Sequence, residues 1–143
     1  MNREPIYAAL FARLAEAGGF RTASRRLRHW SDVAAVEQPA LFLAQKSETA
    51  EQRGALPTKW SCDLDAYVYC HAPDEATAAT TILNPLLDAI EAALAPSGAD
   101  VATNTQTLGG LVYQAAIVGK IETDEGTLGG QAVAIVPIRI IVP

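Results

Sequence analysis

Hydrophobic side chains alternate most regularly near the C-terminal end of the chain, in residues 131–142. Every even position from Ala132 to Val142 is aliphatic. Because successive side chains of a strand point to opposite faces, these residues predict one strand face buried in a core. The apolar segment 111–118 and the polar stretch 123–126, which ends in glycine, complete the pattern of an antiparallel hairpin. We therefore expect a C-terminal β-hairpin at the centre of the fold.

The odd positions of residues 131–142 are also largely apolar, and the charged residue among them is Arg139. A strand that is apolar on both faces needs cover from a helix, a neighbouring strand or another subunit. Pro137 cannot donate a ladder hydrogen bond, which predicts an edge or a bulge at this position. An uncovered apolar edge is an association surface. Pro137 and Arg139 are therefore candidate interface residues.

Two amphipathic helices are predicted. Residues 2–17 have apolar side chains at a spacing of three and four, with Asn2 as the cap and two glycines at the end. Residues 74–94 have a wider apolar face that contains Pro85. This proline either bends one helix or follows a new cap at Asn84, and we favour one bent helix.

Two further segments have strand patterns. Residues 38–44 predict a short buried strand, and the polar residues 45–58 predict a long loop. Residues 60–72 alternate cleanly between an apolar face and a polar face. The polar face carries Tyr67 and Tyr69, and tyrosines are enriched at protein interfaces. Both tyrosines are therefore candidate interface residues.

These elements predict one domain over residues 1–143. The expected class is α/β (α+β): a single mixed, mostly antiparallel sheet with two main helices packed on it and a C-terminal β-hairpin. Half of the residues are hydrophobic, which is enough for a core. No apolar run approaches the ~18 residues that span a bilayer, and residues 1–5 lack a signal-peptide pattern. We therefore expect a soluble protein with no membrane partner.

The net charge of −5 is unevenly distributed along the chain. Through Trp60 there are nine basic and six acidic residues, and after Trp60 there are two basic and ten acidic residues. If the two charges lie on opposite faces, copies would attract head to tail, an arrangement that closes into rings. Chance distribution over a solvated surface is the alternative explanation.

Residues 20–30 carry the strongest local charge signal. The segment contains the candidate interface residues Arg21, Arg25, Arg26, Arg28 and Trp30. Arginines beside an aromatic ring can bind nucleic acid. In a chain with excess acid, however, a solvated or partner-facing strand is the better interpretation.

The sequence contains few candidates for chemistry. Cys62 and Cys70 lie eight residues apart on one strand, about 27 Å at ~3.4 Å per residue, and cannot form a disulfide there. Asp63 and Asp65 alone do not define a metal or acid–base site. We find no nucleophile motif and no phosphate loop. The inventory predicts an interaction domain that is not an enzyme and needs no cofactor or metal.

The order of these features resembles the tail terminator proteins of long-tailed bacteriophages, the minor tail protein U type of lambda-like phages. The resemblance covers nearly the whole chain. It rests on the N-terminal helix, the basic segment 25–30, the strands 38–43 and 60–69, the proline-bearing helix segment 83–90 and the closing hairpin.

The resemblance implies a small α/β subunit of a ring, expected to be a hexamer, on the end of the tail tube. Such a ring stops tube polymerisation and provides the head-joining surface. The implied partners are other copies of the chain, the tail tube protein and a head–tail connector or neck protein, with DNA only passing through the lumen. The implied location is the virion tail, reached from the host cytoplasm during assembly. A neck or tail-completion adaptor and a generic ring-forming domain are the alternatives.

The acidic stretch with Asp124 and Glu125 suggests one further expectation. As a loop facing the lumen or an axial partner, it would repel DNA phosphates and keep the channel non-adhesive.

Overall fold

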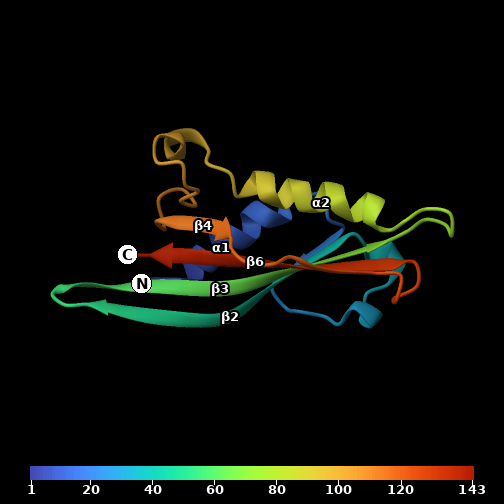
Figure 1. Ribbon diagram of the computed structural model, residues 1–143, viewed down its shortest axis with the longest axis horizontal. Coiled ribbons are helices and arrows are strands. Elements are labelled where there is room, and N and C mark those ends of the chain that lie inside the picture. The colour runs from blue at the N-terminus through green and yellow to red at the C-terminus, as the bar shows by residue number, and fades with distance from the viewer.

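The structure is a computed structural model that describes the backbone of residues 1–143 and all of their side chains except that of Ala99. It has two α-helices and a mixed six-stranded sheet, which confirms the predicted fold class (Figure 1). The strand order is β1-β2-β3-β6-β4, and β5 also pairs with β6. The α-helices are α1 (Arg3–Ala15) and α2 (Thr80–Ala93), and the strands are β1 (Thr22–Ser24), β2 (Ala40–Arg53), β3 (Leu56–His71), β4 (Gln114–Ile117), β5 (Glu122–Glu125) and β6 (Gln131–Val142).

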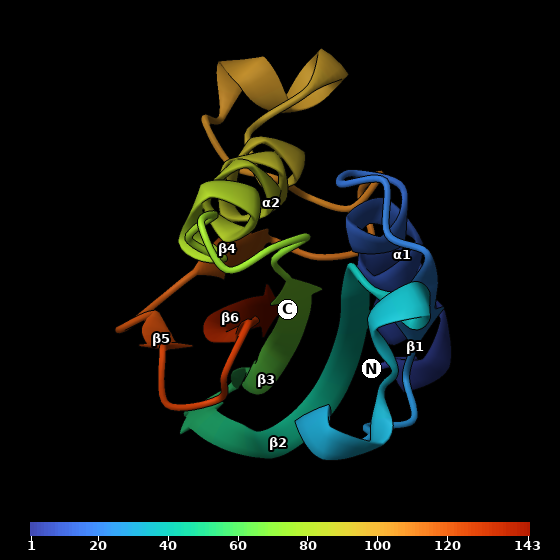
Figure 2. The ribbon, with the colours of Figure 1, turned by 90° about the vertical axis from the view of Figure 1, so that its right-hand side faces the viewer.

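The main core lies between one face of the sheet and the two helices. All even positions of β6 from Ala132 to Val142 are buried there, as their alternation predicts. From α1 the core receives Leu10 and Leu14, and from α2 it receives Leu83 and Ile90, which are fully buried. Seen along the strands, the sheet curls, with α2 above it and α1 at the right beside β1 (Figure 2).

A second, smaller core lies on the opposite sheet face. It consists of Val33, Ala40, Phe42, Tyr69 and Val133. The chain between β1 and β2 covers these residues. This connection contains two short 3-10 helices, η1 (Trp30–Asp32) and η2 (Ala35–Glu37). Only part of this face is covered, so the rest of it remains an open surface.

The predicted loop at 45–58 is wrong, because these residues belong to a long hairpin. β2 continues to Arg53 and pairs with β3 from Leu56, so the turn is Gly54 and Ala55. We call residues 45–60 the arm. Backbone pairing with β3 holds these polar residues in strand geometry although most of them bury little surface. The arm tip extends past the C-terminus in Figure 1.

The C-terminal hairpin is present but interrupted. β4 pairs with the end of β6 and β5 pairs with its beginning, both antiparallel. The expected strand 111–118 is shortened to Gln114–Ile117. β6 is an inner strand between β3 and the β4–β5 edge, so the expected edge at Pro137 is wrong. Pro137 instead lies opposite the break between β4 and β5, where its carbonyl accepts a hydrogen bond from the Val118 N–H at 3.1 Å.

The two helices differ from prediction at their ends. α1 ends at Ala15, and the Asn2 side chain makes no cap hydrogen bond. α2 begins at Thr80 because Asp74 caps a preceding turn through the Ala76 N–H. Pro85 lies inside this single helix, as favoured. With 13 and 14 residues, neither α-helix of the described chain reaches the ~20 residues that a membrane span requires.

Candidate interaction surfaces

The arginine-rich segment contacts other parts of the same chain. The expected strand over residues 20–30 is limited to β1, and the chain then bends into η1. Arg25 forms an ion pair of 2.6 Å with Glu4 of α1. Arg28 donates two hydrogen bonds to the Glu37 carboxylate and one to the carbonyl of Asp32. Arg28 therefore fixes the cover of the small core, and Arg25 joins the segment to α1.

Each ion pair favours the ionised form of its acid. The hydrogen bond from Arg25 lowers the pKa of Glu4. The hydrogen bonds from Arg28, followed by that of the Ala34 N–H, lower the pKa of Glu37. Both carboxylates are therefore ionised at neutral pH, and each holds an arginine against the subunit.

Arg21 and Arg26 remain on the surface. Both residues are exposed. Arg21 donates one long hydrogen bond, 3.4 Å, to the Val36 carbonyl. For Arg26, the described residues offer no side-chain hydrogen bond or ion pair, although its backbone N–H bonds to Ser24. These two arginines are the part of the segment that can still meet an acidic partner.

Tyr69 is buried within the fold. Its side chain is only 3% exposed and packs against Phe42, with ring centroids 5.5 Å apart. The hydroxyl donates to the carbonyl of Arg28 at 2.7 Å. Burial raises the pKa of Tyr69 to about 12. The predicted polar face is therefore wrong here, because the η1–η2 connection covers it.

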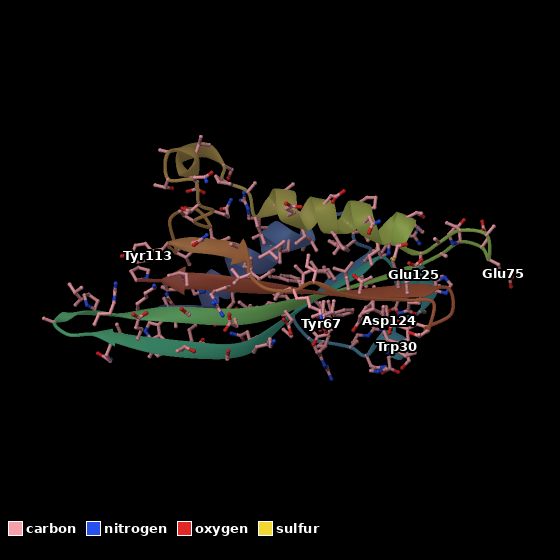
Figure 3. The ribbon with its side chains drawn as sticks, in the orientation of Figure 1. Trp30, Tyr67, Glu75, Tyr113, Asp124 and Glu125 are labelled. Carbon is pink, nitrogen blue, oxygen red and sulfur yellow. The ribbon has the colours of Figure 1, made fainter. Side chains whose placement is uncertain are left out.

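The open sheet face brings together residues from distant parts of the sequence. Figure 3 shows Trp30, Tyr67 and Asp124 on the same side of the sheet, away from the helices. Trp30 and Tyr67 are half-buried against the small core. A depression of about 500 Å³ lies beside Trp30 and Ile135 and continues to β5. This face presents apolar surface with a charged margin.

The margin of the open face includes Arg139 and Pro137 of β6. Arg139 is exposed and donates to Asp63 of β3 at 2.8 Å. This hydrogen bond lowers the pKa of Asp63 and raises that of Arg139. Pro137 is half-buried. Arg139 is thus already paired with an acid of the same chain.

Asp124 and Glu125 lie in an edge strand, so the expected acidic loop is wrong. Both belong to β5, and all four residues of this strand are exposed. The turn follows at residues 126–130. Asp124 accepts a hydrogen bond from the Thr127 hydroxyl. Glu125 accepts one from the Thr80 N–H at 3.5 Å.

The two cysteines lie in the main core. Cys62 and Cys70 are at most 1% exposed. Burial raises the pKa of Cys70 to about 11, so its thiol stays protonated at neutral pH. Among the described side chains, no group of three or more His, Cys, Asp or Glu residues is placed to hold a metal ion.

Sequence reasoning missed the internal partners of the arginines and the edge position of β5. Glu4 and Glu37 lie 21 and 9 residues from their arginines, which is not a local helical spacing. The edge position depends on which strand pairs with β6. A polar strand whose neighbours are unknown has the same pattern as a loop.

Comparison with known proteins assigns no family. No protein-family model matches the chain, and no curated protein matches its sequence. A function therefore has to be inferred from the surfaces of the protein.

Proposed function

We propose that this protein is the subunit of a ring that caps the tail tube of a long-tailed bacteriophage. The ring, expected to contain six copies, stops the addition of tube protein and offers the surface to which the head joins. The subunit acts by docking and not by catalysis, and it needs no cofactor. This proposal begins from the resemblance of the sequence to tail terminators.

The observation that carries it is a sheet with two uncovered edges of opposite charge. β1 lies at one edge beside Arg21 and Arg26, and β5 lies at the other edge with Glu122, Asp124 and Glu125. Unpaired edges bind other strands, and natural monomers usually block them. Two different edges on opposite sides support a head-to-tail contact, which repeats until a ring closes.

The elongated shape supports two different axial contacts. The arm tip is at one end of the long axis, and the loop with Glu75 and the turn after β5 are at the other (Figures 1 and 3). If the sheet edges join copies, these ends face along the ring axis. One end would meet the tail tube protein and the other the neck or connector protein. DNA would only pass through the lumen, because chains with a net charge of −5 would not attract its phosphates.

The decisive experiment removes the protein from phage assembly. Tails made without it are expected to carry overlong tubes that do not join heads, and supplying the wild-type protein restores normal length. Electron microscopy measures both outcomes. Tubes of normal length that fail to join heads would instead assign the protein to a neck or tail-completion adaptor. Normal, infectious tails would exclude both roles.

A measurement on the purified protein tests ring formation separately. Native mass spectrometry over a range of concentrations, with and without isolated tail tubes, is expected to find one discrete multiple of the subunit mass. A protein that stays a single chain under all these conditions, and does not bind tubes, contradicts the proposal.

A further inference from the structure

Five strands of the sheet, β1, β2, β3, β6 and β5, are aligned at the same height along the strand direction. The two edge strands, β1 and β5, are therefore not shifted relative to each other in that direction. The row that passes through the small core illustrates this alignment. Its successive strand partners are Thr22, Ala40, Tyr69, Val133 and Asp124. A second row, two residues along, contains Ser24, Phe42, Tyr67, Ile135 and Glu122.

The strand at each end of these rows has a free side. β1 pairs with β2 alone and β5 with β6 alone among the described strands. Ala23 of β1 is exposed, as is Thr123 of β5. Figure 2 places β1 and β5 on opposite sides of the curled sheet. Within the described chain, each of these edge strands is therefore unpaired on its outer side.

The strand directions make this contact antiparallel. β1 is parallel to β2, and β2 and β6 are both antiparallel to β3, so β1 and β6 run the same way. β5 runs opposite to β6. Rotation of a copy about an axis along the strands leaves these directions unchanged. β5 of one copy would therefore meet β1 of the next as an antiparallel pair, which is slightly more stable than a parallel one.

We propose that β5 of each copy pairs with β1 of the next copy, so that one sheet continues across every subunit boundary. This inference rests on the proposed ring and specifies its lateral contact. The common height of the two edge strands matters because copies that join without a shift along the rotation axis form a closed ring. A contact with such a shift would produce an open helix.

The same register places two charged side chains, each with one long hydrogen bond in its own chain, next to each other. If Asp124 faces Thr22 across the boundary, the next antiparallel pair is Glu125 with Arg21. Glu125 belongs to the helix face, since its partner is Ala132 of the main core, and Arg21, one residue before β1, would turn from the Val36 carbonyl of η2 to meet it. Within the subunit, Glu125 and Arg21 make single hydrogen bonds of 3.5 and 3.4 Å.

The other charges near this boundary already have partners in the subunit. Glu122 pairs with Lys120 at 3.3 Å, Arg25 pairs with Glu4 at 2.6 Å, and Asp124 accepts from Thr127. Arg26 lies beyond the end of β1. The Arg21–Glu125 pair is therefore the charge contact that sets the register. This assignment places Asp124 and Glu125 at the boundary between subunits and replaces their expected position in the lumen.

A charge exchange tests the pair. Arg21→Glu and Glu125→Arg are each expected to raise the concentration for half-maximal ring formation at least ~10-fold, which is about 1.4 kcal/mol. The double variant restores the opposite charges at every boundary and should return most of the affinity. Glu75→Arg is the control, because Glu75 is exposed but lies outside the row and outside both edge strands. Thermal melts verify that each variant is folded.

A cysteine pair tests the register itself. In the variant Ala23→Cys with Thr123→Cys, the two Cα atoms of neighbouring copies would lie about 4.5 to 5.5 Å apart, within reach of a disulfide. Mild oxidation should produce a ladder of covalent multimers that ends at the ring size. The control pairs Ala23→Cys with Val118→Cys, which is exposed on the same edge as β5 but at another level.

The outcomes separate this inference from the proposed function. Wild-type rings that cap tubes, together with no cross-linking at 23–123 and no effect of the charge variants, would overturn the β1–β5 contact and leave the function standing. Equal cross-linking of the control pair would also overturn the register. A wild-type protein that never associates, with or without tubes, would overturn the function first.

Discussion

At the scale of single side chains, Tyr7 and Glu48 join α1 to the base of the arm. The Tyr7 hydroxyl donates to Glu48 at 2.6 Å, and the Arg3 guanidinium donates to both oxygens of the same carboxylate. Arg3 also lies over the Trp60 ring, 5.2 Å from its centroid. Burial, followed by the bond to Glu48, raises the pKa of Tyr7, and the same bond lowers the pKa of Glu48.

The ionised form of Glu48 should therefore stabilise the fold in a pH-dependent manner. Its folded pKa is below the ordinary value of 4.5, so the contribution is complete above 4.5 and disappears as the pH falls through the folded pKa. Glu48→Gln should reduce the free energy of unfolding by about 1 kcal/mol at neutral pH and by less near pH 3. Urea unfolding at both pH values measures this.

The control is Glu51→Gln, because Glu51 is a more exposed acid of the same strand with a single ion pair of 3.9 Å to Lys59. It should change stability little at either pH. An equal loss for Glu48→Gln at neutral and acidic pH would show that packing, and not charge, explains the contribution of Glu48.

At the scale of elements, the arm is held mainly by its own backbone ladder. Leu41, Phe42 and Leu43 of β2 are at most 3% exposed, whereas most residues from Gln45 to the turn are exposed. Leu56, next to the turn, is 61% exposed. The arm therefore has no core of its own, although it belongs to the same hairpin as the best-buried strands.

Protection against amide hydrogen exchange should fall steeply along β2. Amides at 41–43 should exchange only through global unfolding, and those at 49–53 through local opening of the arm. Hydrogen exchange followed by mass spectrometry resolves the two segments. Protection at 49–53 equal to that at 41–43, in the isolated subunit, would contradict a locally stabilised arm. Tube or neck protein that docks on the arm should slow exchange there.

The sequence predicted well those elements whose side chains enter the main core. Alternation in β6 and helical periodicity in α1 and α2 follow from burial on one face, so the pattern itself identifies the element. The arm has no such pattern, since both of its faces meet solvent and its polar residues are typical of a loop. The prediction that Tyr69 is exposed was wrong for a related reason. The chain between β1 and β2 buries Tyr69, and its position could not be predicted from the sequence.

The candidate contact between β1 and β5 could not have been predicted from sequence. The segment with Arg21 and the segment with Glu125 lie about a hundred residues apart, and their common level depends on the register of three intervening strands. The charge imbalance between the two parts of the chain suggested a head-to-tail arrangement. Only the sheet order places these charges on opposite edges.

At the scale of the whole molecule, two surfaces are candidates for a contact between copies. The first is the pair of charged edges at β1 and β5. The second is the open sheet face, where Trp30, Tyr67 and Ile135 form apolar surface beside the depression of about 500 Å³. The two surfaces differ in their response to salt, because salt screens exposed charges and does not weaken apolar contacts.

Ring formation through the edges should weaken as salt is raised. Between about 0.05 and about 0.5 M sodium chloride, the screening length falls several-fold, so the concentration for half-maximal association should rise several-fold. Analytical ultracentrifugation measures this shift. The double variant Arg21→Gln with Glu125→Gln should associate more weakly and lose most of the salt dependence. The contact would instead lie on the open face if salt leaves association unchanged or strengthens it and if Tyr67→Ser abolishes it. Salt does not weaken contacts that bury apolar surface.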